Sequence, residues 1–205
     1  MKLIDEIDRC PAVFDDLDAA SLSAITAPEI RAVVRRKNGA LALSGALVLF
    51  GSGADLGSPL HLARYRTWSA RADYGLEATD DVFGADVFGD LLFARSGGVY
   101  RLDGESGDHV RLGETGEFFE LPRADIAEAL GGHLGRERFS GRVIGPDPLR
   151  LLPTAPFMTS QNIAGAFFEA PLTRALALKH RLFLACRGIA EGAAIDCSFW
   201  RAEVG

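Results

Sequence analysis

The residue types best suited to chemistry in this chain are its cysteines and histidines. They are Cys10, Cys186, Cys197, His61, His109, His133 and His180. A nucleophilic thiol needs a base and electropositive surroundings, and the spacing of His180 and Cys186 puts them on different faces of an expected helix. Cys186 and Cys197 sit in apolar runs, so we predict buried, inert thiols. The histidines form no HxH, HxxxH or HExxH pattern, and neither a metal nor a cofactor is expected.

Other catalytic and ligand-binding motifs are also missing from the sequence. It has no GxSxG elbow, and neither GxGxxG nor a P-loop occurs in a suitable context. "GSGADLG" (51–57) follows an expected strand without the spacing of a phosphate loop, which predicts a turn. "DGESGD" (103–108) offers oxygen ligands for calcium. Apolar strand residues precede Glu114, the position that an EF-hand would need, so a hairpin turn is predicted there instead.

The most unusual charge feature is an acidic stretch between residues 73 and 90 that contains no Lys or Arg. Its acids are Asp73, Glu77, Asp80, Asp81, Asp86 and Asp90. One interpretation is a contact patch that steers a basic partner and raises the association rate. The other is a solvated loop leading into a sheet. Asp15, Asp16 and Asp18 would extend such a patch if the fold brings them near it.

Composition restricts the class of protein. The chain has 205 residues, 48% of them apolar, which is enough for one sizeable core. A net charge of −6 disfavours a nucleic-acid or anionic-membrane partner and suits a basic protein partner, although acidity can also serve solubility alone. No apolar run approaches a membrane span, and the start "MKLIDEID" does not read as an export signal. An odd number of cysteines without such a signal predicts reduced thiols and a cytoplasmic location.

Helices are expected in four regions. Residues 2–9 have helical apolar spacing, and 170–188 have a wide apolar face. In "TAPEIRAVVRRKNG", Thr26 is the expected cap, with Pro28 in the first turn and Glu29 completing a capping box. Residues 114–135 also have helical spacing, with Pro122 dividing or starting a helix. A short helix or irregular arm is expected over 58–75.

Strands are expected mainly in the middle of the chain. "ALALSGALVLFG" (40–51) predicts one or two strands with Gly45 at a bulge or turn. Residues 90–95, 98–103 and 109–114 predict three strands joined by turns too short for parallel crossovers. Residues 135–158 are proline-rich and loop-like, the best candidate for a linker, but Leu149, Leu151, Leu152 and Phe157 indicate that the segment packs on the body of the protein. The alternation in 193–204 predicts a final strand.

One segment resembles a known family. Residues 83–90 match an "F(A/G)xDxFGD" pattern, residues 99–108 match a "VYxxDxExGE"-like hairpin, and the paired aromatics Phe118 and Phe119 follow. This arrangement resembles the SUKH superfamily, which includes a yeast cell-wall assembly regulator and many bacterial immunity proteins. The similarity extends over residues 20–200 and is strongest over 80–120.

The resemblance implies an α+β fold, with a central antiparallel meander sheet and helices packed around it. It implies one domain over 1–205, with a possible subdivision into a core of 1–135 and a C-terminal helix-strand extension of 136–205. It further implies a non-catalytic binding protein, most commonly an immunity protein. Such proteins neutralise a cognate bacterial toxin delivered by a type VI or contact-dependent system.

Within the resembling motif, the residues themselves suggest structural roles. Gly84 and Gly89 are expected to permit sharp turns. Phe83 and Phe88 would anchor those turns in the core. Asp86 and Asp90 would accept hydrogen bonds from turn amides, which leaves acids available to a partner only at the rim.

Two other functions stay open at this point. One is a housekeeping regulatory or scaffold module that recruits a cellular partner. The other is a small enzyme whose Cys, His or Asp residues are brought together by folding.

Overall fold

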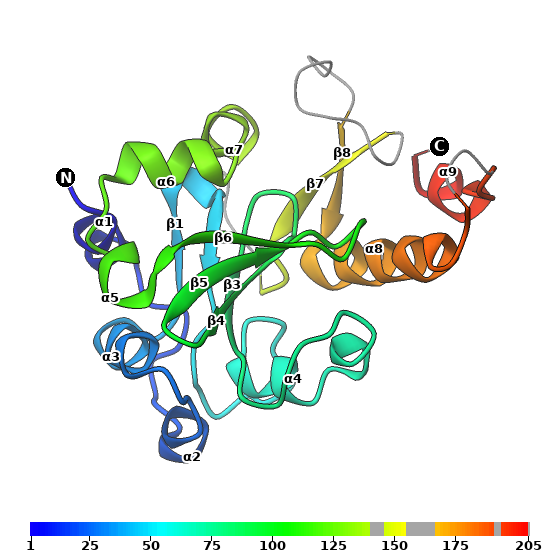
Figure 1. Cartoon of the computed structure of the whole chain (residues 1–205). Helices are drawn as coiled ribbons and strands as arrows, with labels where there is room; N and C mark the ends of the chain where they lie inside the picture. The colour runs from blue at the N-terminus through cyan, green and yellow to red at the C-terminus, as the bar shows by residue number, and fades with distance from the viewer. Residues whose placement is uncertain (140–145, 155–166, 191–193, 205) are drawn as a thin grey trace.

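The protein is an α+β structure built on one antiparallel sheet (Figure 1). The computed structural model describes residues 1–139, 146–154, 167–190 and 194–204. Six strands lie in chain order, each antiparallel to the next, which confirms the predicted fold class. They are β1 (Ala40–Ala42), β2 (Leu47–Leu49), β3 (Asp81–Ala85), β4 (Leu91–Arg95), β5 (Gly98–Leu102) and β6 (His109–Glu114).

Helices surround this sheet. Those before it or within its long connection are α1 (Leu3–Arg9), α2 (Ala19–Ser23), α3 (Pro28–Arg36) and α4 (Leu62–Arg66). Those after it are α5 (Thr115–Phe118), α6 (Arg123–Ala129), α7 (Gly132–Phe139), α8 (Leu172–Cys186) and α9 (Ser198–Val204). Figure 1 shows α1, α2 and α3 on one side of the sheet and α8 on the other.

The predicted meander is present with its predicted turns. Ser96 and Gly97 form the tight β4–β5 turn with φ of 49° and 80°, and Arg95 pairs with Gly98 across it. Positive φ at both positions matches the right-handed twist of the flanking strands. The segment 40–51 forms two strands, β1 and β2, with Gly45 in the turn between them at φ 86°.

The prediction of a turn at Gly84 is wrong, because Gly84 lies inside strand β3. A Cβ at this position would stand 2.5 Å from the carbonyl oxygen of Val48 on β2, so glycine is required by close backbone approach. The register of β3 against β4 shifts between Val82 and Gly84. Phe83, at this shift, is buried against Phe118 and Phe119, as its predicted anchoring role requires.

Several helices begin and end where the sequence predicts. α1 and α8 lie within the expected ranges, and Pro122 immediately precedes α6. The predicted cap of α3 is wrong: Ala27 is the N-cap residue, and the helix start is held by a carboxylate from β3 that is described below. The predicted linker is also partly wrong, since α7 continues to Phe139 and β7 (Leu149–Pro153) lies within it. Residues 140–145 and 155–158 of that linker lie outside the described residues.

The C-terminal part forms a smaller layer beside the main sheet. β7 pairs with β8 (Phe167–Pro171), and α8 packs on both. The predicted final strand is instead the helix α9, which buries Trp200 and directs its Nε1 to the Pro153 carbonyl at 2.8 Å. A second hydrophobic cluster results, made of Leu152, Ala170, Ala175, Leu178, Leu182 and Trp200.

This smaller layer is joined to the main core. The amide of Leu151 donates to the Val87 carbonyl at 2.8 Å, and Leu151 and Leu172 belong to the main hydrophobic cluster. Arg150, which is 1% exposed, donates to the carbonyls of Gly45 and Asp86 at 2.8 and 3.0 Å. Within the described part of the chain, no helix combines the length and hydropathy that crossing a membrane requires.

Candidate functional site

The structure divides the predicted acidic stretch into buried and accessible carboxylates. Asp80, Asp81, Asp86 and Asp90 are only 1%, 4%, 0% and 7% exposed. For these four residues, burial contradicts both interpretations, the contact patch and the solvated loop. Asp73 is half-buried and Glu77 is exposed. The partners of the buried carboxylates show why burial is tolerated.

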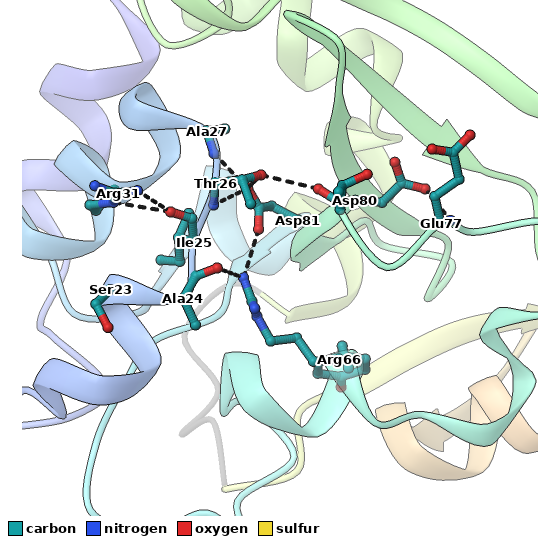
Figure 2. A network of polar contacts seen from close by, with 12 residues as sticks. Ser23, Ala24, Ile25, Thr26, Ala27, Arg31, Arg66, Glu77, Asp80 and Asp81 are labelled. Carbon is teal, nitrogen blue, oxygen red and sulfur yellow. Dashed lines mark hydrogen bonds and ion pairs between the residues drawn. The ribbon is translucent and has the colours of Figure 1, made fainter.

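Asp81 holds the start of α3 (Figure 2). Its Oδ2 accepts hydrogen bonds from the amides of Thr26 and Ala27 and from the Thr26 hydroxyl, each at 2.7 Å. Its Oδ1 pairs with Arg66 at 3.0 Å, and the same guanidinium donates to the Ala24 carbonyl. A carboxylate at a helix N-terminus satisfies free amides and opposes the helix dipole. Asp81 therefore does the capping that the sequence assigned to Thr26.

Asp80 is neutralised by a guanidinium from the sheet. Arg95 on β4 donates from Nε to Oδ1 at 2.9 Å and from Nη2 to Oδ2 at 2.5 Å, the two-pronged geometry that suits a carboxylate. Its hydrogen bond with Asp80 raises the pKa of Arg95. The amide of Glu77 also donates to Asp80 Oδ2 at 2.7 Å. Asp80 thereby fixes the loop before β3 to the end of β4.

Asp86 organises the β3–β4 turn, as the sequence predicts. Its Oδ1 accepts from the amides of Phe88 and Asp90 at 2.8 and 3.0 Å, and Gly89 takes φ 80°. Its buried Oδ2 has no hydrogen-bond partner among the described residues, and the Arg101 Nη1 atom lies 3.8 Å away. Burial, reinforced by the charge of Asp90, raises the pKa of Asp86 to about 7.

Asp90 reaches beyond its own turn, which the prediction of local hydrogen bonds did not include. Its Oδ1 accepts from the Gly104 amide in the β5–β6 turn at 3.0 Å and from Lys179 Nζ on α8 at 2.5 Å. Lys179 is 3% exposed. Burial opposes its charge, but Asp90 and Asp86 outweigh burial and raise the pKa of Lys179. This buried pair ties α8 to the main sheet.

Asp73 and Glu77, the two acids of the stretch that are not buried, have different surroundings. Asp73 contacts α8, with Oδ2 2.9 Å from His180 Nε2 and Oδ1 3.5 Å from Arg187. Glu77 is the exposed acid of the stretch. The six acids of the predicted partner-binding site therefore do not form one accessible surface.

The histidines mostly serve the fold. His61 is fully buried, with Nε2 2.8 Å from the Gly53 carbonyl oxygen and Nδ1 accepting from the Ala63 amide at 3.1 Å. His109 Nε2 lies 3.0 Å from the Tyr74 carbonyl oxygen. Among the described residues, no group of three or more His, Cys, Asp or Glu side chains could together hold a metal ion.

The cysteines are free thiols in two distant parts of the chain. All three are half-buried, whereas the sequence predicts burial. Burial raises the pKa of Cys10 and of Cys186. A raised thiol pKa disfavours the thiolate, the nucleophilic form.

Two hollows on the described surface have similar volumes. One, of about 410 Å³, lies between the start of α3 and the β4–β5 turn, and its lining includes Thr115, whose buried hydroxyl has no hydrogen-bond partner among the described residues. The other, of about 480 Å³, is called here the N-terminal groove. Its lining residues are Pro11, Ala12, Val13, Phe14, Leu41, Asp55, Ser58, Leu60 and Pro146.

The N-terminal acids lie beside this second groove. The sequence raised Asp15, Asp16 and Asp18 as a possible extension of the acidic stretch. Asp15 directly follows the lining residue Phe14, and Asp16 Oδ2 accepts from the Ala54 amide at 2.8 Å. Asp15 and Asp16 are exposed. The sequence identifies these acids but does not predict the apolar hollow, because the residues that line it come from four separate segments.

Comparisons with known proteins assign no relatives. No family model, curated protein or solved structure matches the chain. Function is therefore inferred from the residues, from their geometry and from the SUKH resemblance of the segment around 80–120.

Proposed function

We propose that this chain is a non-catalytic binding protein of the SUKH type that neutralises a cognate bacterial toxin by direct contact. The observation that carries this proposal is the meander itself. The segment that resembles the family folds into β3 to β6, and its Phe83, Gly89 and Asp90 build the sheet and its turns. A family motif with a structural role suits a family whose members differ in what they bind.

The use of the polar residues also supports binding over catalysis. His61, Asp81 and Lys179 are buried and each has hydrogen-bond partners that fix the fold. A catalytic group needs access to a substrate. The immunity protein would act in the bacterial cytoplasm by covering the active surface of a type VI or contact-dependent toxin. Its net charge of −6 would favour association with a basic toxin.

Co-expression with the product of the adjacent gene tests this function. The neighbour alone should arrest growth, and this chain should restore growth and co-elute with it as a complex in size-exclusion chromatography. A toxic neighbour that is neither neutralised nor bound would contradict the proposal. A non-toxic neighbour that binds would favour a housekeeping regulatory or scaffold module.

A further inference from the structure

We infer that the N-terminal groove is a docking site for an extended segment of a partner protein in which an apolar side chain is flanked by Lys or Arg. We take the occupant to be the toxin of the proposed function, so the identity of the occupant rests on that function.

The groove has an apolar interior of suitable size. Leu41 of the edge strand β1, Leu60 and Phe14 contribute to a lining that encloses about 480 Å³. That volume is in the range of small-molecule pockets and accommodates one or two large side chains. Leu60 is 2% exposed, while Leu41 and Phe14 are half-buried. An apolar group from a partner would therefore complete a partly covered surface.

The wall formed by residues 11–18 is held firmly in place. The Phe14 ring lies on Gly51 and Gly53, where an added Cβ would come within 2.6 and 2.3 Å of ring atoms. Asn38 accepts from the Ser52 amide at 2.6 Å and donates to the Asp16 carbonyl. A site held in shape before binding loses less conformational entropy when a partner docks. Two glycines of "GSGADLG", Gly51 and Gly53, are thus explained by Phe14.

The rim of the groove is acidic. Asp15, Asp16 and Asp55 are exposed and make no ion pair with Lys or Arg within the described residues. The nearby cations Lys37 and Arg64 donate instead to the carbonyls of Cys10 and Gly57. Both cations keep their positive charge, so the three carboxylates leave a small excess of negative charge around the apolar hollow, which favours a cationic occupant over nucleic acids and anionic lipids.

Exposed leucines adjoin the groove on the same segments. Leu17 is 42% exposed and Leu56 is 61% exposed. The two segments that carry them are tied together by the hydrogen bond between Asp16 and Ala54 and by that from the Asp18 amide to the Ser52 carbonyl. Apolar anchors inside a polar rim are the usual composition of a protein interface. The groove and these leucines together form one surface suited to a basic, partly apolar segment.

A titration followed by amide NMR tests the groove directly. The probes are two short peptides with the same central leucines, one flanked by Lys and Arg and the other by Glu. The cationic peptide should shift the amide signals of Leu41, Leu60 and their neighbours in a saturable way, and the acidic peptide should leave them unchanged. No shift at these residues, or equal shifts with both peptides, would overturn the inference.

Surface variants localise the effect with matched controls. Asp15→Lys and Leu56→Ser should each weaken binding of the cationic peptide about tenfold, a change of about 1.4 kcal/mol. Ala12→Trp should block the groove by filling it. Glu117→Lys on α5 and Leu184→Ser on α8 make the same chemical changes at exposed positions elsewhere and should leave affinity unchanged. Equal losses in the control variants would mean non-specific charge attraction.

The adjacent gene product separates failure of the groove from failure of the proposed function. If it binds the wild-type chain but is insensitive to the groove variants, the docking inference is wrong and the proposed function stands. If it does not bind at all, the proposed function fails, while the peptide titration still decides the groove. A dimer of this chain that dissociates on Leu56→Ser would assign the groove to a second copy and overturn the partner inference.

Discussion

Two acidic regions of this protein have similar composition and opposite environments. Residues 80–90 carry four carboxylates, and all four are buried. Asp55 lines the N-terminal groove, Asp15 and Asp16 follow its lining residue Phe14, and all three acids are exposed. In the first region, backbone amides meet each carboxylate, and cations from other segments pair with Asp80, Asp81 and Asp90. In the second, within the described part of the chain, each acid meets at most one backbone amide and no cation.

The difference shows that a run of acids in the sequence does not reveal whether the carboxylates are buried or exposed until their partners are known. Burial of a carboxylate is costly unless charge pairing and hydrogen bonds compensate for it. Arg66, Arg95 and Lys179 supply that compensation, and each lies far from its partner along the chain. Where no such cation arrives, a carboxylate stays in water and is available to another molecule. Four predictions test this contrast, from the largest expected effect to the smallest.

Asp90→Ala should have the largest effect on stability. It leaves Lys179 buried without its pair and the Gly104 amide without its acceptor. Breaking a buried pair on one side costs roughly 3–5 kcal/mol of unfolding free energy. Urea denaturation measures this loss. The double variant Asp90→Leu with Lys179→Met should recover much of it, and a double variant as unstable as the single one would contradict the charge-pair explanation.

Asp81→Ala should destabilise the start of α3. It removes the acceptor of the Thr26 and Ala27 amides and the partner of Arg66. Loss of a cap and of a buried acceptor together cost about 3 kcal/mol. Amide exchange at Thr26 and Ala27 should accelerate along with the loss of global stability. Asp81→Asn keeps an acceptor oxygen and should lose about half as much. Unchanged exchange in Asp81→Ala would show that the capping is unimportant.

Asp86→Asn should change how stability depends on pH. The folded-state pKa of Asp86 is raised to about 7 by burial and by Asp90, whereas the unfolded value is about 3.9. Between these values the folded chain keeps a proton that the unfolded chain has released, so the stability of the wild type falls as pH rises toward 7. The variant lacks this titration and should gain on the order of 2 kcal/mol relative to the wild type from about pH 5 to pH 8. Parallel stability curves for the two proteins would refute the assignment.

Asp15→Lys should have the smallest effect. Asp15 is exposed and has no ion pair among the described residues, so the free energy of unfolding should change by less than about 0.5 kcal/mol. Thermal denaturation of this variant beside Asp90→Ala compares the two acidic regions directly. A loss of more than about 1 kcal/mol would mean that the groove acids, too, serve stability rather than recognition.

Local patterns predicted a large part of the fold. Alternation and short glycine turns identified β4, β5 and β6, and apolar spacing identified α1, α3 and α8. The wrong predictions at Trp200 and Gly84 have a common cause, which is contact with a distant segment of the chain. The run around Trp200 alternates like a strand, but a short apolar run cannot distinguish strand from helix, and α9 forms where Trp200 can reach Pro153. Gly84 reads as a turn, although the carbonyl of Val48 on another strand requires the glycine.

The candidate site was less predictable than the fold. The sequence identified Asp15 and Asp16 only as a possible supplement to the acids of 73–90. It gave no sign that Phe14, Leu41, Leu60 and Pro146 meet in one hollow. A pattern along the chain reports which face of an element is apolar, but it does not report which distant segments leave a gap between them.

By itself, the sequence determined the antiparallel meander, its hairpins and the acidic balance of the chain, because these depend on neighbours a few residues apart. Only the tertiary structure decided which acids are buried in hydrogen bonds and ion pairs and which remain exposed at the surface. That outcome depends on whether a cation such as Lys179 is brought to a carboxylate from the far end of the chain. The free energy of a buried charge is set by such contacts, and local sequence does not encode them.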